Sequence, residues 1–369
     1  MRGNPALPPR VEDEPMNVPW THRHARWLLG GVLVMALACA GLIAGSAGTS
    51  DPVSPLPPPS RALLVYARPT GSPPLGGPEV IYRATPDGRD PVRLVPGRDP
   101  VLSPDGRWIA FWRSTPGGPG RVFVISSGGG RPHPLAASAD DAVVWSWDSR
   151  FIASATLGRV SIVNVDTGSV QELKVPEGSG DFTFSPDGKE LAFSHSTGTG
   201  TNIMGIAPSD GRLWSLTDDD RSYAPLWGPR GIAFERFGID GKGDRCANCH
   251  GDVWLMNAGG GDVHQLTHTH AGIYPAAWSA NGDRILAAYP ATHNGRLYAV
   301  DVATGGTRAL TRFVGDLFAQ GLSRNGRVVL AAIGCGGTAS AYGLIETIPF
   351  AGGPPSVVVR GPCRATWTA

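Results

Sequence analysis

The sequence lacks the short motifs that mark the common catalytic and nucleotide-binding sites. It has no G-x-S-x-G nucleophile elbow, no Walker-type phosphate loop and no G-x-G-x-x-G fingerprint. It also lacks an excess of charge, since 32 basic residues stand against 31 acidic ones, and this balance argues against a nucleic-acid partner. No amphipathic helical stretch follows the first 50 residues. These absences favour a non-catalytic protein built from strands, and they leave its ligand open.

Charge is also missing from one long run near the N-terminus. Arg23 and Arg26 precede an apolar stretch, and no charged residue follows them until Asp51. The stretch is long enough to cross the hydrocarbon core of a membrane as a helix. The arginines before it place the N-terminus in the cytoplasm. We therefore expect a short disordered cytoplasmic tail (1–26), a single transmembrane signal-anchor (27–45), a Pro- and Ser-rich linker (46–60) and an exported domain (61–369).

Two other interpretations of this segment remain open. Cleavage after Ala47 would release a secreted protein. Lipidation of Cys39 would make a lipoprotein, although the preceding Leu37 lies one place away from its usual position in a lipobox. All three interpretations put the residues from about 60 onward outside the cytoplasm, at a bacterial cell membrane.

Glycine (51 residues) and proline (34 residues) are abundant, and they cluster between short runs rich in Val, Ile, Phe, Trp and Tyr. This sequence pattern is typical of short strands joined by tight turns. Six turn sequences recur at spacings of 43, 39, 43, 51 and 44 residues. A period in the low forties with four strands per unit predicts the blades of a β-propeller. The six turns lie at 103–106, 146–149, 185–188, 228–231, 279–282 and 323–326.

The ends of the repeat predict how the ring closes. Residues 61–95 supply three strands of a further unit but not its first strand. Residues 364–368 match the pattern of a first strand, as seen at 143–146 and 276–279. We therefore expect an all-β propeller of seven four-stranded blades, with blade 1 completed by the C-terminal strand, which removes exposed sheet edges. A six-bladed ring is the alternative.

The repeat resembles the TolB-type propeller repeat. The similarity lies in S-P-D-G-R-W-I-A-F at 103–111, in S-P-D-G-K-E-L-A-F at 185–193, and in endings such as L-W-S-L-T at 213–217. It covers about residues 60–369. The family includes a periplasmic protein of the Tol system, with six blades, and the propeller domains of prolyl oligopeptidase-like enzymes. The resemblance implies an extracytoplasmic binding platform without fixing its partner.

Four cysteines follow the apolar segment, and an exported compartment permits disulfides. In an up-and-down blade the loops between the second and third strands share a face with the connections to the next blade. Cys335 falls in such a loop of the last unit and Cys363 in the connection after it. We therefore predict a Cys335–Cys363 disulfide.

The string C-x-x-C-H at Cys246, Cys249 and His250 is the sharpest chemical signal. It has the spacing that attaches c-type haem. Together with His268 and His270, the same residues could instead hold zinc. A local Cys246–Cys249 disulfide, with no cofactor at all, is the third possibility.

Two functions follow from these patterns. The first is a non-catalytic binding or scaffold propeller, monomeric, that recognises an envelope protein, a peptide or a cell-wall ligand. Its binding residues would lie on the loop face near Asp218, Arg245, His268 and His270. The second is a metal- or c-haem-dependent redox or hydrolytic protein that uses the Cys246, Cys249 and His250 loop.

Overall fold

A computed structural model gives the structure of this protein for most of residues 62–368. It describes residues 62–71, 78–115, 118–135, 143–156, 158–238, 251–289, 295–312, 317–323, 325–334, 343–361 and 364–368. No helix among them is long and apolar enough to span a membrane. Several predictions concern residues outside the described ones: the tail, signal-anchor and linker of 1–60, and Cys39, Arg245, Cys246, Cys249, His250, Cys335 and Cys363.

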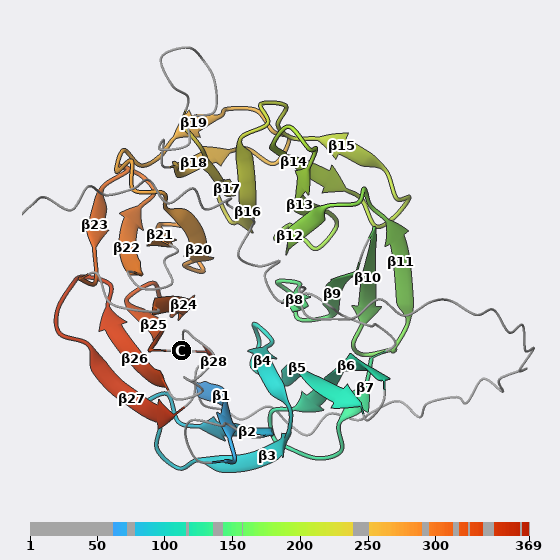
Figure 1. Cartoon of the computed structure of the whole chain (residues 1–369), viewed down its shortest axis with the longest axis vertical. Helices are drawn as coiled ribbons and strands as arrows, with labels where there is room; N and C mark the ends of the chain where they lie inside the picture. Colours follow the sequence, from blue (N-terminus) through green and yellow to red (C-terminus); the bar gives the residue numbers. More distant parts are fainter. Residues whose placement is uncertain are drawn as a thin grey trace, which may run out of the picture. The chain divides into compact units, whose positions relative to one another are not determined.

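Within the described residues, twenty-eight strands form seven four-stranded antiparallel sheets, arranged as the blades of a ring (Figure 1). The inner strands, A, are β28 (Arg364–Thr368), β4 (Arg98–Leu102), β8 (Val143–Trp145), β12 (Ser179–Phe184), β16 (Ser222–Gly228), β20 (Tyr274–Trp278) and β24 (Leu317–Leu322). The B strands are β1 (Leu63–Pro69), β5 (Trp108–Thr115), β9 (Phe151–Thr156), β13 (Leu191–Ser196), β17 (Gly231–Arg236), β21 (Arg284–Tyr289) and β25 (Val328–Ile333). The C strands are β2 (Glu79–Ala84), β6 (Gly118–Ser126), β10 (Arg159–Asn164), β14 (Thr201–Ile206), β18 (Asp252–Met256), β22 (Arg296–Asp301) and β26 (Gly343–Pro349). The outer strands, D, are β3 (Val92–Pro96), β7 (His133–Pro134), β11 (Val170–Lys174), β15 (Leu213–Ser215), β19 (His264–Gln265), β23 (Thr307–Ala309) and β27 (Ser356–Gly361).

The seven blades and the way the ring closes confirm the prediction, and the six-bladed alternative was wrong. Blade 1 is the sheet β28-β1-β2-β3, so its inner strand comes from the end of the chain. β28 pairs with β1 in antiparallel register from Leu63↔Thr368 to Ala67↔Arg364. Figure 1 shows β28 beside β1 in the sheet that also holds β2 and β3. This pairing covers an edge of β1 that would otherwise expose unpaired backbone groups.

The ring has two faces, which differ in their connections. The A–B face carries the turns between A and B strands, and the B–C face carries the loops between B and C strands and the connections from each D strand to the next blade. The two chain ends of the ring meet at the A–B face, because Leu63 opens β1 opposite Thr368. The B–C face is therefore free of both ends.

The repeated turn is held by its own side chains. In blade 2 the Ser103 hydroxyl donates to Asp105 at 2.6 Å and accepts from the backbone N–H of Trp108 at 3.0 Å. Gly106 follows with φ of +77°, a conformation that costs glycine nothing. The same serine-to-aspartate bond recurs between Ser185 and Asp187. The side chains of these aspartates therefore have a structural role, because their hydrogen bonds hold the turns.

The hydrophobic core lies between the blades. Seven clusters of buried residues are present in the described part of the chain, and each joins two neighbouring blades. The B strands are buried on both sides, which explains continuous apolar runs such as Ile285 to Ala288. One cluster joins blade 7 to blade 1, with Leu330 against Leu64 and Tyr66. The last blade therefore packs on the first as every other pair does.

Candidate functional site

A polar cluster lies at the B–C face of blade 5, where β17 ends and β18 begins. Tyr223 and Glu235 are direct cross-strand neighbours there. The inner strand is irregular at this point: its register shifts after Tyr223, and Ala224 has φ of +51°. Matching shifts occur in β12 at Asp181 (φ +52°) and in β4 at Asp99 (φ +49°). Such bulges commonly re-aim side chains at the rim of a closed sheet.

Glu235 is the most unusual residue of this cluster. Its side chain is buried, with 1% of the residue exposed, and Oε2 has no hydrogen-bond partner among the described residues. A Cβ at Gly251 would lie 2.3 Å from Oε1, so the backbone of Gly251 covers the carboxyl group closely. A buried acceptor without a partner is costly in a stable fold, and it often marks a functional group.

Burial raises the pKa of Glu235 to about 8. The hydrogen bond with Tyr223 opposes this rise, and the nearby charge of Asp252 adds to it. Burial also raises the pKa of Tyr223 well above its ordinary value, helped by the charge of Glu235. At neutral pH Glu235 is therefore mostly a neutral acid, able to donate as well as to accept a hydrogen bond.

Asp252 organises the connection from blade 5 to blade 6. It is 3% exposed and accepts hydrogen bonds at 2.8–3.0 Å from the hydroxyls of Thr267 and Thr269 and from the backbone N–H groups of Thr269 and His270. Asn202 holds the matching place in β14, where it accepts from the backbone N–H of Asp220. The carboxylate of Asp252 is thus fully engaged in holding a loop.

Replacement of Asp252 tests this role. We expect Asp252→Ala to lower the free energy of unfolding by about 3 kcal/mol, because buried donors left unpaired cost about 1–3 kcal/mol each. Asp252→Asn should cost about 1 kcal/mol, since an amide oxygen can accept the same bonds. Urea unfolding measures both variants, with Asp210→Ala, an exposed turn residue, as the control. Equal losses for the Ala and Asn variants would contradict a hydrogen-bonding role.

The two predicted histidines lie in this same connection. His270 is 79% exposed at its side chain, and its Nδ1 is 3.4 Å from Asp252. His268 is exposed as well. The carbonyl of Gly251 accepts from the N–H groups of Gly272 and Ile273, at 2.9 and 3.2 Å. The connection that carries both histidines therefore runs beside the residue that directly follows the C-x-x-C-H string.

The acidic run before blade 5 divides into one exposed residue and two structural ones. Asp218 is exposed. Asp219 pairs with Arg236 and, at 3.8 Å, with Arg221. Asp220 accepts from Asn202, as part of the same loop structure. Among the described residues, no three His, Cys, Asp or Glu side chains are grouped so that they could hold a metal ion.

Sequence reasoning missed Tyr223, Glu235 and Asp252. The signal for Glu235 was an acidic residue at the end of an otherwise apolar B strand, G-I-A-F-E-R at 231–236. The signal for Asp252 was its position directly after the C-x-x-C-H-G string. Neither signal distinguishes a buried carboxyl from a surface one.

A second charged group lies on the same face at blades 1 and 2. Arg364, the first residue of β28, is 3.4 Å from Asp99 of β4. Burial raises the pKa of Glu79, and the charge of Asp99 adds to that rise. The rim of the ring therefore carries half-exposed charges of both signs at a seam between two blades.

The Cys335–Cys363 disulfide stays a prediction, because both residues lie outside the described ones. Their described neighbours lie at one end of blade 7: Ile333 pairs with Leu344, and Gly343 pairs with Gly361. We expect peptide mapping without reductant to find this bond. Its removal by Cys335→Ser should lower the free energy of unfolding by about 2–4 kcal/mol. A mapped bond from either cysteine to Cys246 or Cys249 would contradict the prediction.

No family model and no curated protein sequence matches this chain. Solved structures do match. The propeller domain of the Trilobed protease from Pyrococcus furiosus has a TM-score of 0.61 at 15% identity, over 85% of this chain and 95% of that one. Oligogalacturonate lyase in complex with manganese has a TM-score of 0.55 at 15% identity, over 81% and 84%. TolB from Acinetobacter baumannii has a TM-score of 0.51 at 18% identity, over 83% and 82%.

This chain has a β-propeller fold similar to that of TolB. At these identities the likeness shows the fold alone. Because a lyase and the propeller of a protease have the same architecture, the fold of the TolB-like propeller does not decide between binding and catalysis. That decision depends on the side chains at the two faces.

Proposed function

We propose that this TolB-like propeller is a non-catalytic, extracytoplasmic binding platform that recognises an envelope protein, a peptide or a cell-wall component through its B–C face. The observation that carries the proposal is the asymmetry between the faces. On the A–B face the turns are nearly uniform in sequence, and their polar side chains form hydrogen bonds with each other within each turn. On the B–C face the loops range from 157–158 to 237–251. Variable loops on a rigid ring are where such folds carry recognition.

The Glu235 cluster (Tyr223, Glu235, Asp252 and His270) gives this face its specific chemistry. The carboxyl group of Glu235 is buried under Gly251 and supports the cluster from inside, whereas the imidazole of His270 is open to a ligand. The exposed imidazole of His270 lies beside a buried carboxylate. Peptides and wall components both present amides and hydroxyls, so both match this donor and acceptor set. The location at the cell envelope is inferred from the apolar segment of 27–45 and the arginines that precede it.

A comparison of the two faces tests the proposal. The full chain, fixed on beads, is exposed to envelope extract and separately to purified peptidoglycan fragments. The B–C variant carries Asp218→Ser and His268→Ser, and the A–B control carries Asp166→Ser and Lys189→Ser, all four being exposed residues. We expect the B–C variant to lose at least about ten-fold in binding of one ligand, which corresponds to 1.4 kcal/mol. Equal binding by both variants would overturn the assignment to the B–C face.

A second candidate function has one specific observation in its favour. The connection with His268 and His270 is hydrogen-bonded to Gly251, next to the C-x-x-C-H string. This arrangement favours a metal- or c-haem-dependent redox or hydrolytic protein. A visible spectrum and metal analysis of the purified full chain separate the two candidates. A Soret band with stoichiometric iron, or one zinc per chain, supports the second; a colourless, metal-free protein contradicts it.

A further inference from the structure

Blade 1 differs from the other six blades at the A–B face. Its A and B strands are the last and first strands of the ring, so no turn joins Thr368 to Leu63. At several other seams the turns of neighbouring blades contact each other, as Arg230 and Asp283 do between blades 5 and 6. In blades 2 and 3, the N–H of Asp105 donates to the hydroxyl of Ser149 at 3.0 Å. At the seam between blades 7 and 1, blade 1 therefore contributes no A–B turn that could contact the turn of blade 7.

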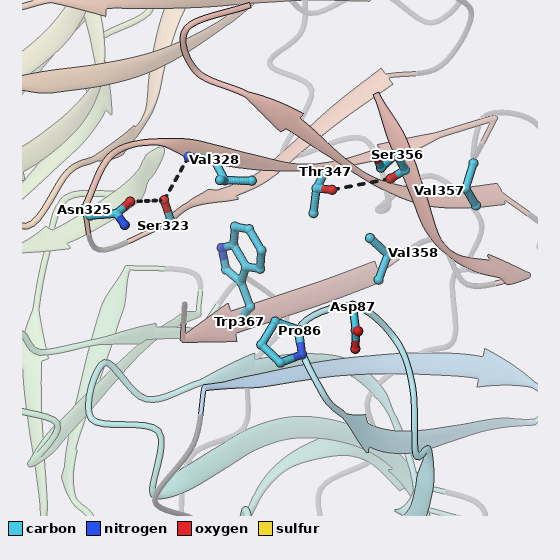
Figure 2. A pocket seen from close by; sticks show the side chains of 10 residues that line it. All are labelled: Pro86, Asp87, Ser323, Asn325, Val328, Thr347, Ser356, Val357, Val358 and Trp367. Carbon is cyan, nitrogen blue, oxygen red and sulfur yellow. Dashed lines mark hydrogen bonds between the residues drawn. The ribbon is translucent and has the colours of Figure 1, made fainter. Parts of the chain in front are cut away.

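A groove lies at that seam, with a volume of about 370 Å³. Figure 2 shows Trp367 between the turn that holds Asn325 in blade 7 and Pro86 in blade 1. Val357 and Val358 extend the apolar lining toward the outer strands. Val357 is 43% exposed, which is unusual for so large an apolar side chain in this ring. The groove is thus an aromatic and aliphatic channel with polar groups along its edges.

The indole of Trp367 marks the groove as incomplete. Trp145 occupies the matching place in blade 3 and donates its Nε1–H to the carbonyl of Val101 at 3.0 Å. Trp278 does the same in blade 6, to Leu226 at 2.9 Å. The Nε1–H of Trp367 is buried and has no partner among the described residues. A buried indole N–H normally finds an acceptor, so the seam beside Trp367 is packed less completely than the seams beside Trp145 and Trp278.

We propose that the groove binds the chain's own proline-rich segment, residues 52–59, which precedes the ring. This segment reads P-V-S-P-L-P-P-P and carries no charge. A proline-rich segment favours the polyproline II conformation, whose apolar proline rings suit an aromatic and aliphatic groove. Asp87, the charged residue of the lining, is already paired with Arg89. An uncharged segment therefore meets no unpaired charge in this groove.

The position of the segment in the chain supports the same occupant. Leu63 lies opposite Thr368, one residue beyond Trp367, so the chain enters the ring beside the groove. Residues 52–59 in polyproline II conformation would rise about 3.1 Å per residue and so extend over about 25 Å. A short tether also gives the segment an effective concentration in the millimolar range, so that weak contacts suffice. The docked segment would replace the cover that the missing turn provides elsewhere.

Photo-crosslinking of the full chain tests the proposal. A benzophenone side chain is placed at position 56 of the detergent-purified protein, and the crosslinked peptides are identified by mass spectrometry. We expect intramolecular crosslinks to the peptides that contain Pro86 or Val358. Replacing the prolines at 55 and 57–59 by serine should reduce them at least five-fold. Crosslinks between two chains, crosslinks scattered over the ring, or none at all would overturn the proposal.

Peptide binding tests the role of Trp367 separately. The probe is a labelled peptide of residues 50–60, and the binder is the full chain with serine at 55 and 57–59. Trp367→Phe should weaken binding about three- to ten-fold, because the smaller ring offers less apolar contact area to the segment. Trp278→Phe, which breaks the matching bond elsewhere, should leave binding unchanged. Equal binding by the parent binder, the Trp367→Phe variant and the Trp278→Phe variant would show that Trp367 is not part of the site. Loss of this binding would not affect the proposed B–C face, which is assayed separately.

Discussion

Deletion of residues 364–369 is expected to leave the propeller unable to fold as a stable ring. The deletion removes β28, which pairs with β1 along Leu63 to Ala67. Each lost backbone hydrogen bond costs about 1 kcal/mol, and each newly exposed large apolar side chain costs about 1.5–3 kcal/mol. Leu64 and Tyr66, now almost fully buried, would become exposed. The total approaches the ~5–15 kcal/mol that stabilises a typical domain.

Thermal unfolding and size-exclusion chromatography measure the effect. We expect aggregation or loss of a cooperative transition in the truncated protein. A permuted control carries residues 364–368 in front of residue 62, joined through a Ser-Pro-Asp-Gly turn. Because this order is that of the other six blades, the control should recover cooperative unfolding. A truncated protein as stable as the full chain would show that β28 does not hold the ring closed.

The stability of the protein is expected to fall with rising pH because of Glu235. Its pKa is raised from 4.5 to about 8 by burial, so the folded state retains a proton that the unfolded state has lost. The contribution is fully present below pH 4.5 and is lost as the pH rises through about 8. Between these limits the slope is about −1.4 kcal/mol per pH unit, or roughly 5 kcal/mol in total as an upper bound.

Glu235→Gln isolates this effect because the amide does not titrate. The variant and the native protein should have similar free energies of unfolding at pH 4.5. At pH 9 the variant should be the more stable by up to roughly 5 kcal/mol. Urea unfolding from pH 4.5 to 9 measures the difference, with Glu177→Gln as the control at an exposed position. Parallel profiles for the native protein and Glu235→Gln would contradict the raised pKa.

The sequence predicted the blades because a blade is a local structure. The turn at 103–106 is built by Ser103, Asp105 and Gly106 within a few residues of each other. A motif of this kind needs no distant partner, so its repetition reveals the period. Ring closure was also predictable, since 364–368 repeats the pattern of a first strand and 61–95 lacks one. The count of seven follows from those two observations together.

The chemistry of the two faces was far less predictable. The sequence directed attention to the histidines and cysteines of the B–C face, whereas the strongly raised pKa values belong to Glu235 and Tyr223. The same limit applies to the groove. Trp367 resembles Trp145 and Trp278 in sequence, because each of the three lies near the end of a first-strand pattern. Trp145 and Trp278 are buried core residues, whereas Trp367 is only half-buried and lines the groove.

By itself the sequence determined the turns, the strands, the number of blades and the strand that closes the ring, because each depends on residues that are neighbours in the chain. The tertiary structure alone decided that Glu235 is a neutral acid and that the indole N–H of Trp367 has no partner among the described residues. Both properties depend on strands that are distant in the sequence. The backbone of Gly251 covers the carboxyl group of Glu235, and blade 1 has no A–B turn beside the indole of Trp367. Burial is a property of the packed ring, and no local pattern of residues encodes it.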